Sequence, residues 1–152
     1  MIYTTEYQSP LAPMVIIADD EALLSLEFGS TEARDRNPII DRVRIQLDEY
    51  WEGRRTEFSV PLNAVGTPFQ MSVWQALLTI PYGETRSYGR IAAQIGNPKA
   101  SRAVGMANNR NPISIIIPCH RVIGSDGRLV GYGGGLDKKE WLLAFEAAHR
   151  PL

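Results

Sequence analysis

Two short helical patterns separated by a glycine constrain the fold of this chain more than any other feature. The first pattern follows Ser87, which can cap a helix, and it stops at Gly96. The second starts almost at once, at Asn97-Pro98. Apolar residues at helical spacing give each helix an inner face: Tyr88, Ile91, Ala92 and Ile95, then Ala100, Ala103, Val104 and Ala107. Two short helices joined by a turn of about three residues match a helix-turn-helix.

The outer face of the second helix carries Lys99 and Arg102. In a helix-turn-helix this helix commonly enters a DNA groove, with its early residues nearest the bases. An arginine there could contact guanine, bind phosphate or insert into the base stack. The alternative is a helical hairpin that serves only packing, with Lys99 and Arg102 solvated.

Charge is distributed unevenly along the chain. Residues 1–80 hold six Lys and Arg against twelve Asp and Glu, whereas residues 81–152 hold ten against five. A basic second half favours contact with a polyanion. A single cysteine excludes an internal disulfide and suits a reducing compartment. Without a secretory signal or an apolar stretch of membrane-spanning length, we expect a cytoplasmic protein that does not associate with membranes.

The first half predicts a small α/β module. Asn37 is expected to cap a helix with Pro38 at its first position, and 57–62 is a candidate strand. Three earlier runs have β propensity: Tyr3–Gln8, Met14–Ala18 and Leu23–Phe28. Residues 63–66 are the expected linker. At 152 residues and 44% hydrophobic composition, the chain can form two small domains, here 1–65 and 66–152.

The only cysteine lies beside one of two histidines, in Pro118-Cys119-His120-Arg121. The preceding apolar run, 113–117, is expected to be a buried strand. A sulfur nucleophile needs a base to remove its proton. Neighbouring side chains of an extended segment point to opposite faces, so a turn or a bridging water would have to connect Cys119 with His120. The alternative is a buried structural cysteine.

A glycine-rich segment, 131–135, precedes the last expected helix. Asp137 is the expected N-cap of this helix, and Glu140 stands where a capping box has its glutamate. The functional alternative is that the Glu140 carboxylate orients His120, as a third group orients the base in nucleophile–base pairs.

The run from Ile117 to Val122 resembles the active-site motif of the O6-alkylguanine-DNA alkyltransferases, or methylated-DNA–protein-cysteine methyltransferases. The resemblance spans residues 66–149, and residues 1–65 resemble the family only loosely. Further matching motifs are Pro81-Tyr82-Gly83, Ser87-Tyr88, Ser101-Arg102-Ala103-Val104-Gly105, Asn111-Pro112, Tyr132 and Glu140-Trp141-Leu142-Leu143.

This resemblance implies an α/β N-terminal domain, with a small mostly antiparallel sheet plus a helix, that supports a mainly α C-terminal domain with the helix-turn-helix. It implies DNA repair in one turnover: Cys119 takes a methyl or alkyl group from O6 of guanine, with O4 of thymine as a second candidate, after the base is flipped out. His120 would take the thiol proton through a water, and Glu140 would orient His120. Tyr88 would donate a hydrogen bond to the leaving guanine.

The resemblance also implies a binding surface for double-stranded DNA that contains O6-alkylguanine. Arg102 would be the finger that fills the gap left by the base, and Asn111 would tie the helix-turn-helix to the active-site strand. Further DNA contacts are expected from Lys99, Tyr88, Ser101 and Arg121. The base pocket is expected to be lined by Val122, Tyr132, Gly133 and Gly134. Gly133 stands where some members have serine. We expect a monomer with no cofactor and no metal.

Two other functions remain open. One is a non-reactive relative that binds alkylated DNA, or a plain helix-turn-helix regulator, although the alkyltransferase-like proteins lack the motif's cysteine. The other is a cysteine hydrolase that uses Cys119, His120 and Glu140 on esters or amides with repeated turnover.

Overall fold

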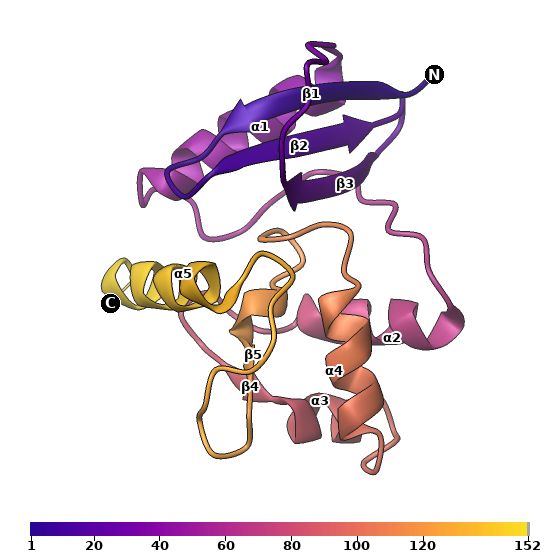
Figure 1. Cartoon of the computed structure of the whole chain (residues 1–152), viewed down its shortest axis with the longest axis vertical. Helices are drawn as coiled ribbons and strands as arrows, with labels where there is room; N and C mark the ends of the chain where they lie inside the picture. The colour runs from indigo at the N-terminus through magenta and orange to yellow at the C-terminus, as the bar shows by residue number, and fades with distance from the viewer. Residues whose placement is uncertain (152) are drawn as a thin grey trace. The chain divides into compact units, whose positions relative to one another are not determined.

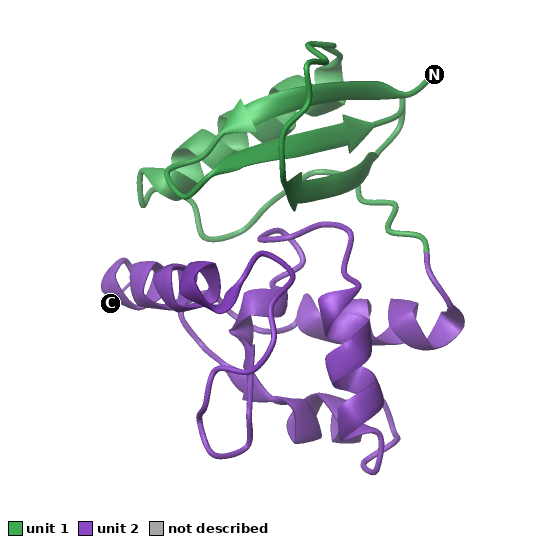
Figure 2. Cartoon of the chain, viewed as in Figure 1, with its two compact units in different colours: residues 1–65 green, residues 66–152 purple. Residues whose placement is uncertain are grey.

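The computed structural model describes residues 1–151. The chain forms two compact units, residues 1–65 (unit 1) and 66–152 (unit 2), which are coloured separately in Figure 2. Among the described residues, no helix has both the length and the apolar character that crossing a membrane requires.

Unit 1 is a three-stranded antiparallel sheet with one helix against it (Figure 1). The strands are β1 (Tyr3–Gln8), β2 (Pro13–Ala18) and β3 (Leu23–Phe28), and the helix is α1 (Pro38–Trp51). Alternate residues of β2 are buried, as expected when one face of a sheet meets a helix. Asn37 caps α1, because its side chain accepts a hydrogen bond from the Ile40 amide at 2.8 Å. The predicted sheet-and-helix module is confirmed.

Residues 57–62 do not form the additional strand that was predicted. The segment touches β3 only at its end, where Leu23 donates to the carbonyl of Pro61 at 2.8 Å and Asn63 donates to the carbonyl of Leu23 at 2.9 Å. Pro61 has no amide hydrogen, so it cannot take a full part in a ladder. A single parallel bridge between Leu23 and Leu62 results.

Unit 2 is mainly helical. Its helices are α2 (Pro68–Leu77), α3 (Tyr88–Gln94), α4 (Ser101–Asn109), the short 3₁₀ helix η1 (Cys119–Arg121) and α5 (Leu136–Ala148). Two-residue strands β4 (Arg86–Ser87) and β5 (Val122–Ile123) pair in parallel. A capping box is present at the start of α2, formed by Thr67 and Gln70. Helices α2, α3 and α4 pack together, and the indole of Trp74 donates to the carbonyl of Ala107 at 2.9 Å.

The helix-turn-helix is present as α3 and α4, but its turn is longer than predicted. Ser87 caps α3 as expected, whereas α4 begins at Ser101 rather than at Asn97-Pro98. Residues 97–100 form a turn closed by a 2.9 Å hydrogen bond from the Ala100 amide to the Asn97 carbonyl. Ala100 therefore precedes the helix, whose buried residues are Val104, Ala107 and Asn108, and Ala103, which was predicted to be buried, is exposed. Lys99 therefore lies outside α4.

The apolar run 113–117 is a series of turns and not the predicted strand. The Ile117 amide donates to the Ile113 carbonyl at 3.1 Å, and the Ile116 amide donates to the Ser114 carbonyl at 2.8 Å. Ile115 has a φ of 72°, which is rare for a β-branched residue and stores strain. The chain therefore approaches the cysteine through a tightly folded, buried segment.

Candidate functional site

Cys119 is the first residue of η1 and is only 4% exposed. Two asparagine side chains form hydrogen bonds with the backbone at and before Cys119. Asn111 donates to the carbonyls of Ile117 at 2.8 Å and Ile113 at 3.2 Å, and accepts from the Ile113 amide. Asn108, on α4, donates to the Cys119 carbonyl at 3.2 Å. Asn111 follows α4 and binds the segment before Cys119, and its role in tying the helix-turn-helix to that segment stays a prediction. Sequence reasoning did not assign a role to Asn108.

The carboxylate beside His120 comes from Glu146, in the last turns of α5. His120 Nε2 and Glu146 Oε2 lie 2.8 Å apart, and both side chains are buried. Glu140 is exposed, one helical position after the buried Lys139. The prediction that Glu140 orients His120 is therefore wrong, because residue 140 lies on the outer face of α5.

Arg121 points into unit 2, away from solvent. Its Nε donates to Glu146 Oε1 at 2.8 Å, its Nη2 donates to Glu146 Oε2 at 3.0 Å, and its Nη1 donates to the Ile80 carbonyl at 2.7 Å. The residue is 6% exposed. The prediction that Arg121 contacts DNA is wrong for this structure, because its guanidinium is buried and already engaged.

These contacts set the proton affinities of the pair. Burial lowers the pKa of His120, Glu146 raises it, and the positive charges of Arg121 and Lys139 lower it further, with a lowered pKa as the outcome. Burial would raise the pKa of Glu146, but the charges and hydrogen bonds of His120 and Arg121 outweigh burial and hold it well below its usual range. Glu146 is thus an ionised acceptor, which assigns the Nε2 proton to a neutral His120. Nδ1 of His120 is buried, and no hydrogen-bond partner for it exists within residues 1–151.

Lys139 is a buried cation that sequence reasoning missed. Its Nζ donates to the carbonyls of Val130 at 3.0 Å and Gly131 at 3.1 Å. Burial lowers the pKa of Lys139 to about 8, and the charge of Cys119 acts in the opposite direction. The buried side chains of α5 are Lys139, Leu142 and Glu146. Two of these three are charged, so the apolar pattern of the sequence did not reveal this face.

The start of α5 also differs from the prediction. Gly135 is the N-cap and has a φ of 102°, a conformation that glycine adopts without strain. Asp137 lies inside the first turn, and the predicted cap at Asp137 is wrong. Because the N-cap lies two residues earlier, Glu140 is the fifth residue after it and not the third, as a capping box requires.

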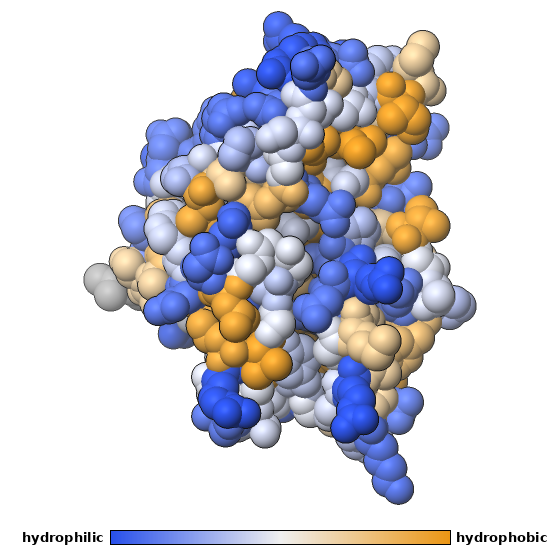
Figure 3. All heavy atoms as spheres, in the orientation of Figure 1, coloured by the Kyte–Doolittle hydropathy of each residue, from blue (hydrophilic) through white to orange (hydrophobic). Residues whose placement is uncertain are grey.

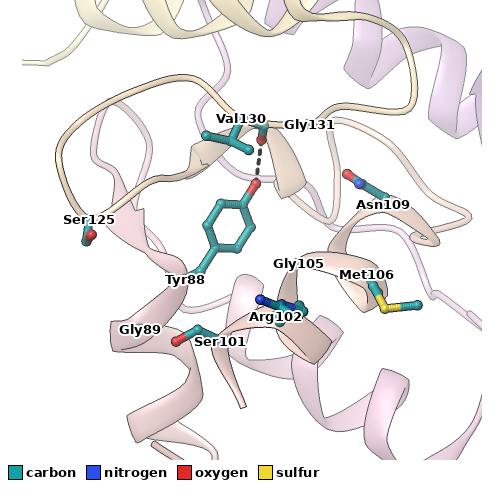
Figure 4. Close-up of a pocket in the computed structure, with 10 residues that line it drawn as sticks. All are labelled: Tyr88, Gly89, Ser101, Arg102, Gly105, Met106, Asn109, Ser125, Val130 and Gly131. Carbon is teal, nitrogen blue, oxygen red and sulfur yellow. Dashed lines mark hydrogen bonds between the residues drawn. The ribbon is translucent and has the colours of Figure 1, made fainter. Parts of the chain in front are cut away.

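A pocket of about 480 Å³ opens between α3, α4 and the loop after β5 (Figure 4). Its lining residues are Tyr88, Gly89, Ser101, Arg102, Gly105, Met106, Asn109, Ser125, Val130 and Gly131. Arg102 and Ser101 line this pocket, as does Tyr88, whereas Lys99 does not. Hydrophilic and hydrophobic residues are interspersed on the face drawn in Figure 3. Two pocket residues, Met106 and Val130, are exposed apolar side chains.

Tyr88 spans the pocket from the start of α3 to the loop. Its hydroxyl donates to the Val130 carbonyl at 2.6 Å, as Figure 4 shows. Burial, together with the charge of Cys119, raises the pKa of Tyr88. Burial and the same charge raise the pKa of Tyr132, and the charge opposes the lowering of the pKa of Lys139.

The expected base-pocket residues are not the ones that line this pocket. Val122 and Tyr132 are buried, and Gly133 and Gly134 lie just beyond the lining segment Val130–Gly131. Gly131 has a φ of 62°, and a Cβ there would lie 3.1 Å from Asn109 Nδ2. The loop thus approaches α4 closely at Gly131, and both the positive φ and the short distance favour glycine at this position.

The family described as 6-O-methylguanine DNA methyltransferase matches the chain in both halves. Its DNA-binding domain matches residues 68–148, and its ribonuclease-like domain matches residues 2–64. The chain is 62% identical to the methylated-DNA–protein-cysteine methyltransferase of Mycolicibacterium paratuberculosis, over 99% of this chain and 96% of the relative. It is 50% identical to the protein of that name from Mycobacterium leprae, over 96% of this chain and 93% of the relative.

Solved structures are similar over the same extent. The structure described as Mycobacterium tuberculosis OGT in complex with DNA matches with a TM-score of 0.90 and 48% identity, covering 98% of this chain and 95% of that chain. The structure of the Mycobacterium tuberculosis O6-methylguanine methyltransferase matches with a TM-score of 0.88 and 45% identity, covering 99% and 96%.

Proposed function

The chain belongs to the methylated-DNA–protein-cysteine methyltransferase family, and we propose that it repairs DNA by transferring a methyl or larger alkyl group from O6 of guanine to Cys119. One observation carries the proposal. Cys119 precedes a buried histidine whose Nε2 is bound by the Glu146 carboxylate, and the charge of Cys119 acts on Tyr88, which lines the pocket on the helix-turn-helix. The reaction needs the thiol, a base and the DNA, without a cofactor.

Unit 2 would bind double-stranded DNA through α4, and unit 1 would support it. Ser101 and Arg102 stand at the start of α4 and line the pocket, which suits a helix that enters a groove with its first turn. The alkylated base must leave the stack to reach a sulfur in a protein core, at a cost of a few kcal/mol. Arg102 is exposed and would fill the gap that the base leaves.

The thiolate of Cys119 would attack the alkyl carbon in line with the bond to O6. Glu146 accepts a hydrogen bond from Nε2 of His120, so Nδ1 is the nitrogen that would take the thiol proton. A water would relay the proton if the sulfur is too far from Nδ1 for direct transfer. The new S–C bond forms as the C–O6 bond breaks, so guanine leaves with the electron pair.

Tyr88 would stabilise the leaving guanine. Its raised pKa keeps the phenol protonated at neutral pH, so it can donate a hydrogen bond to the developing anion. In the free protein this hydroxyl donates to the Val130 carbonyl. The incoming base would therefore replace the Val130 carbonyl as the acceptor of the Tyr88 hydroxyl, which lies 2.6 Å from that carbonyl in the free protein. Lys139 would continue to donate to the Val130 carbonyl.

The thioether at Cys119 would be the end of the reaction, because acid–base groups such as His120 and Glu146 do not hydrolyse an unactivated carbon–sulfur bond. Each molecule would thus act once. A reactive thiol requires a reducing compartment, and we infer a cytoplasmic monomer as the working form.

Intact-mass measurement tests the proposal. The protein is incubated with a duplex that contains one O6-methylguanine, and a gain of one methyl group per protein is expected, which Cys119→Ser abolishes. Because Cys119 is the only cysteine, the gain can be assigned to it by peptide mapping. DNA binding without a mass gain would indicate a non-reactive binding protein. Repeated hydrolysis of an ester or amide would indicate a cysteine hydrolase.

A further inference from the structure

Arg121 is a buried cation that the steps above leave without a role. Its three donor atoms engage both oxygens of Glu146 and the carbonyl of Ile80, and its guanidinium lies 5.6 Å from the ring centroid of Tyr82. Burying an arginine is costly unless its charge is matched. The structure matches it with the one carboxylate that also binds His120.

We propose that Arg121 is a positioning residue of the Cys119, His120 and Glu146 set: it fixes the Glu146 carboxylate and balances its charge, so that His120 stays free to receive the thiol proton. This inference rests on the proposed alkyl transfer. It assigns to Arg121 a part in the proton transfer instead of a contact with DNA.

The geometric part of the argument follows from the sharing of one carboxylate. A planar guanidinium that binds both carboxylate oxygens fixes the plane of the carboxylate. The bond from Nη1 to the Ile80 carbonyl in turn fixes Arg121 against the segment after α2. The fixed carboxylate plane determines from which side Glu146 Oε2 meets His120 Nε2, which lies 2.8 Å away. The imidazole is thereby oriented with Nδ1 on its other side.

The electrostatic part follows from the charges in the cluster. Arg121 and an ionised Glu146 sum to zero, so a neutral His120 leaves the cluster neutral. Without Arg121, the buried carboxylate would be uncompensated, and the pair would bind a proton at His120 or at Glu146. Either product is a weaker base toward Cys119. The other titratable groups facing this cluster are Lys139 on α5, Cys119 on η1, Tyr82 after α2 and Tyr132 in the loop, and Lys139 is bound to loop carbonyls instead of Glu146.

The main test is the pH dependence of alkyl transfer in Arg121→Met, which removes the charge and keeps an unbranched side chain. Single-turnover transfer from O6-methylguanine duplex should slow about tenfold or more at pH 7 and recover at higher pH. The acidic limb of the pH–rate profile should move up by about one pH unit or more. Duplex affinity, measured in the Cys119→Ser background, should be unchanged.

A second readout does not depend on transfer. His120 and His149 are the only histidines, so the imidazole signals of His120 can be followed by NMR with His149 as the internal reference. In Arg121→Met, the His120–Glu146 pair should carry a proton at neutral pH that the wild type lacks. If the wild type transfers no methyl group, the proposed function fails, but this NMR titration still tests the role of Arg121.

Arg121→Lys separates the effect of the charge from the effect of the geometry. It also replaces Arg121→Met in the test if Arg121→Met does not fold. Lysine keeps the charge but lacks the planar fork. The acidic limb should stay within a few tenths of a pH unit of wild type, with a plateau rate reduced severalfold. In a Glu146→Gln background, Arg121→Lys should cause no further fall in the plateau rate, because the carboxylate that the guanidinium orients is absent. An unshifted limb and NMR titration in Arg121→Met, or a loss of rate that equals a loss of duplex affinity, would overturn the proposal.

Discussion

In unit 1 the buried polar side chains are Thr5, Asn37 and Gln46, all neutral, whereas unit 2 buries a histidine, an arginine, a lysine and a glutamate within the described residues 1–151. Gln46 illustrates the first kind, since its amide pairs with the backbone and hydroxyl of Ser59 at 2.9 Å. Such bonds give a buried amide the hydrogen-bond partners that it needs in the folded chain. Buried ionisable groups oppose folding unless they are paired, so their concentration around Cys119 is explained by chemistry.

The largest effect should separate the two glutamates of α5. Glu146→Gln keeps the shape but removes the charge that strengthens His120 as a base, so single-turnover transfer should fall about 100-fold at pH 7. Glu140→Gln, on the exposed face of the same helix, should leave the rate unchanged. Rapid-quench measurement with an O6-methylguanine duplex gives both values. A large loss in Glu140→Gln with a small one in Glu146→Gln would reverse the assignment made from the structure.

The confusion between these glutamates shows what the sequence could not predict. Helix α5 buries Lys139, Leu142 and Glu146, while Trp141 remains 37% exposed. Glu140 was assigned from its place in a capping box and from the resemblance to the alkyltransferases, and neither indicates which face of the helix is buried. The N-cap is Gly135 and not Asp137, so the interpretation of Glu140 as a capping-box residue is also wrong. Only the tertiary contacts with Arg121 and His120 determine which face is buried.

Local signals were reliable where the stabilising bond is itself local. Asn37 and Ser87 were predicted as caps from adjacent sequence, and each accepts a hydrogen bond from an amide three residues later. The run 113–117 failed because its turns depend on the Asn111 side chain, and a short apolar run does not distinguish a strand from buried turns. The strands of unit 1 were predicted because alternation on one face is also local.

Arg102 tests whether the pocket of unit 2 handles DNA. Arg102→Ala should slow repair of duplex about tenfold, because the flipped base is then less well replaced in the stack. Reaction with free O6-benzylguanine, which needs no flipping, should change little. The ratio of the two rates is the measurement. Equal slowing of both substrates would remove the case for an inserted arginine.

Lys139 gives a smaller effect, on the stability of unit 2. Its pKa is lowered to about 8 from 10.5 in the folded chain, so the unfolded chain binds more protons between these values and stability should rise with pH across this window. The contribution should be about 1 to 2 kcal/mol after allowance for solvent screening. Urea unfolding from pH 7 to 10 measures it as the difference between wild type and Lys139→Met.

Lys139→Arg is the matched control, because arginine keeps the charge and the donors but does not titrate. Both variants should lose the rise in stability relative to wild type. A rise that persists in both would assign the titration to another group.

The smallest effect should come from the cap in unit 1. Asn37 accepts from the Ile40 amide and donates to the Asp19 carbonyl at 2.9 Å, so Asn37→Ala leaves two backbone groups without their partner. The expected loss is about 1 kcal/mol of unfolding free energy, measured by urea unfolding at pH 7. The rate of methyl transfer per folded molecule should be unchanged, because no bond of Asn37 reaches the Cys119 set. Asn37→Ser, which keeps a capping oxygen, should recover most of the stability. If Asn37→Ala instead slowed transfer without unfolding the protein, unit 1 would take part in the chemistry, and the division between a supporting unit and a reactive unit would no longer hold.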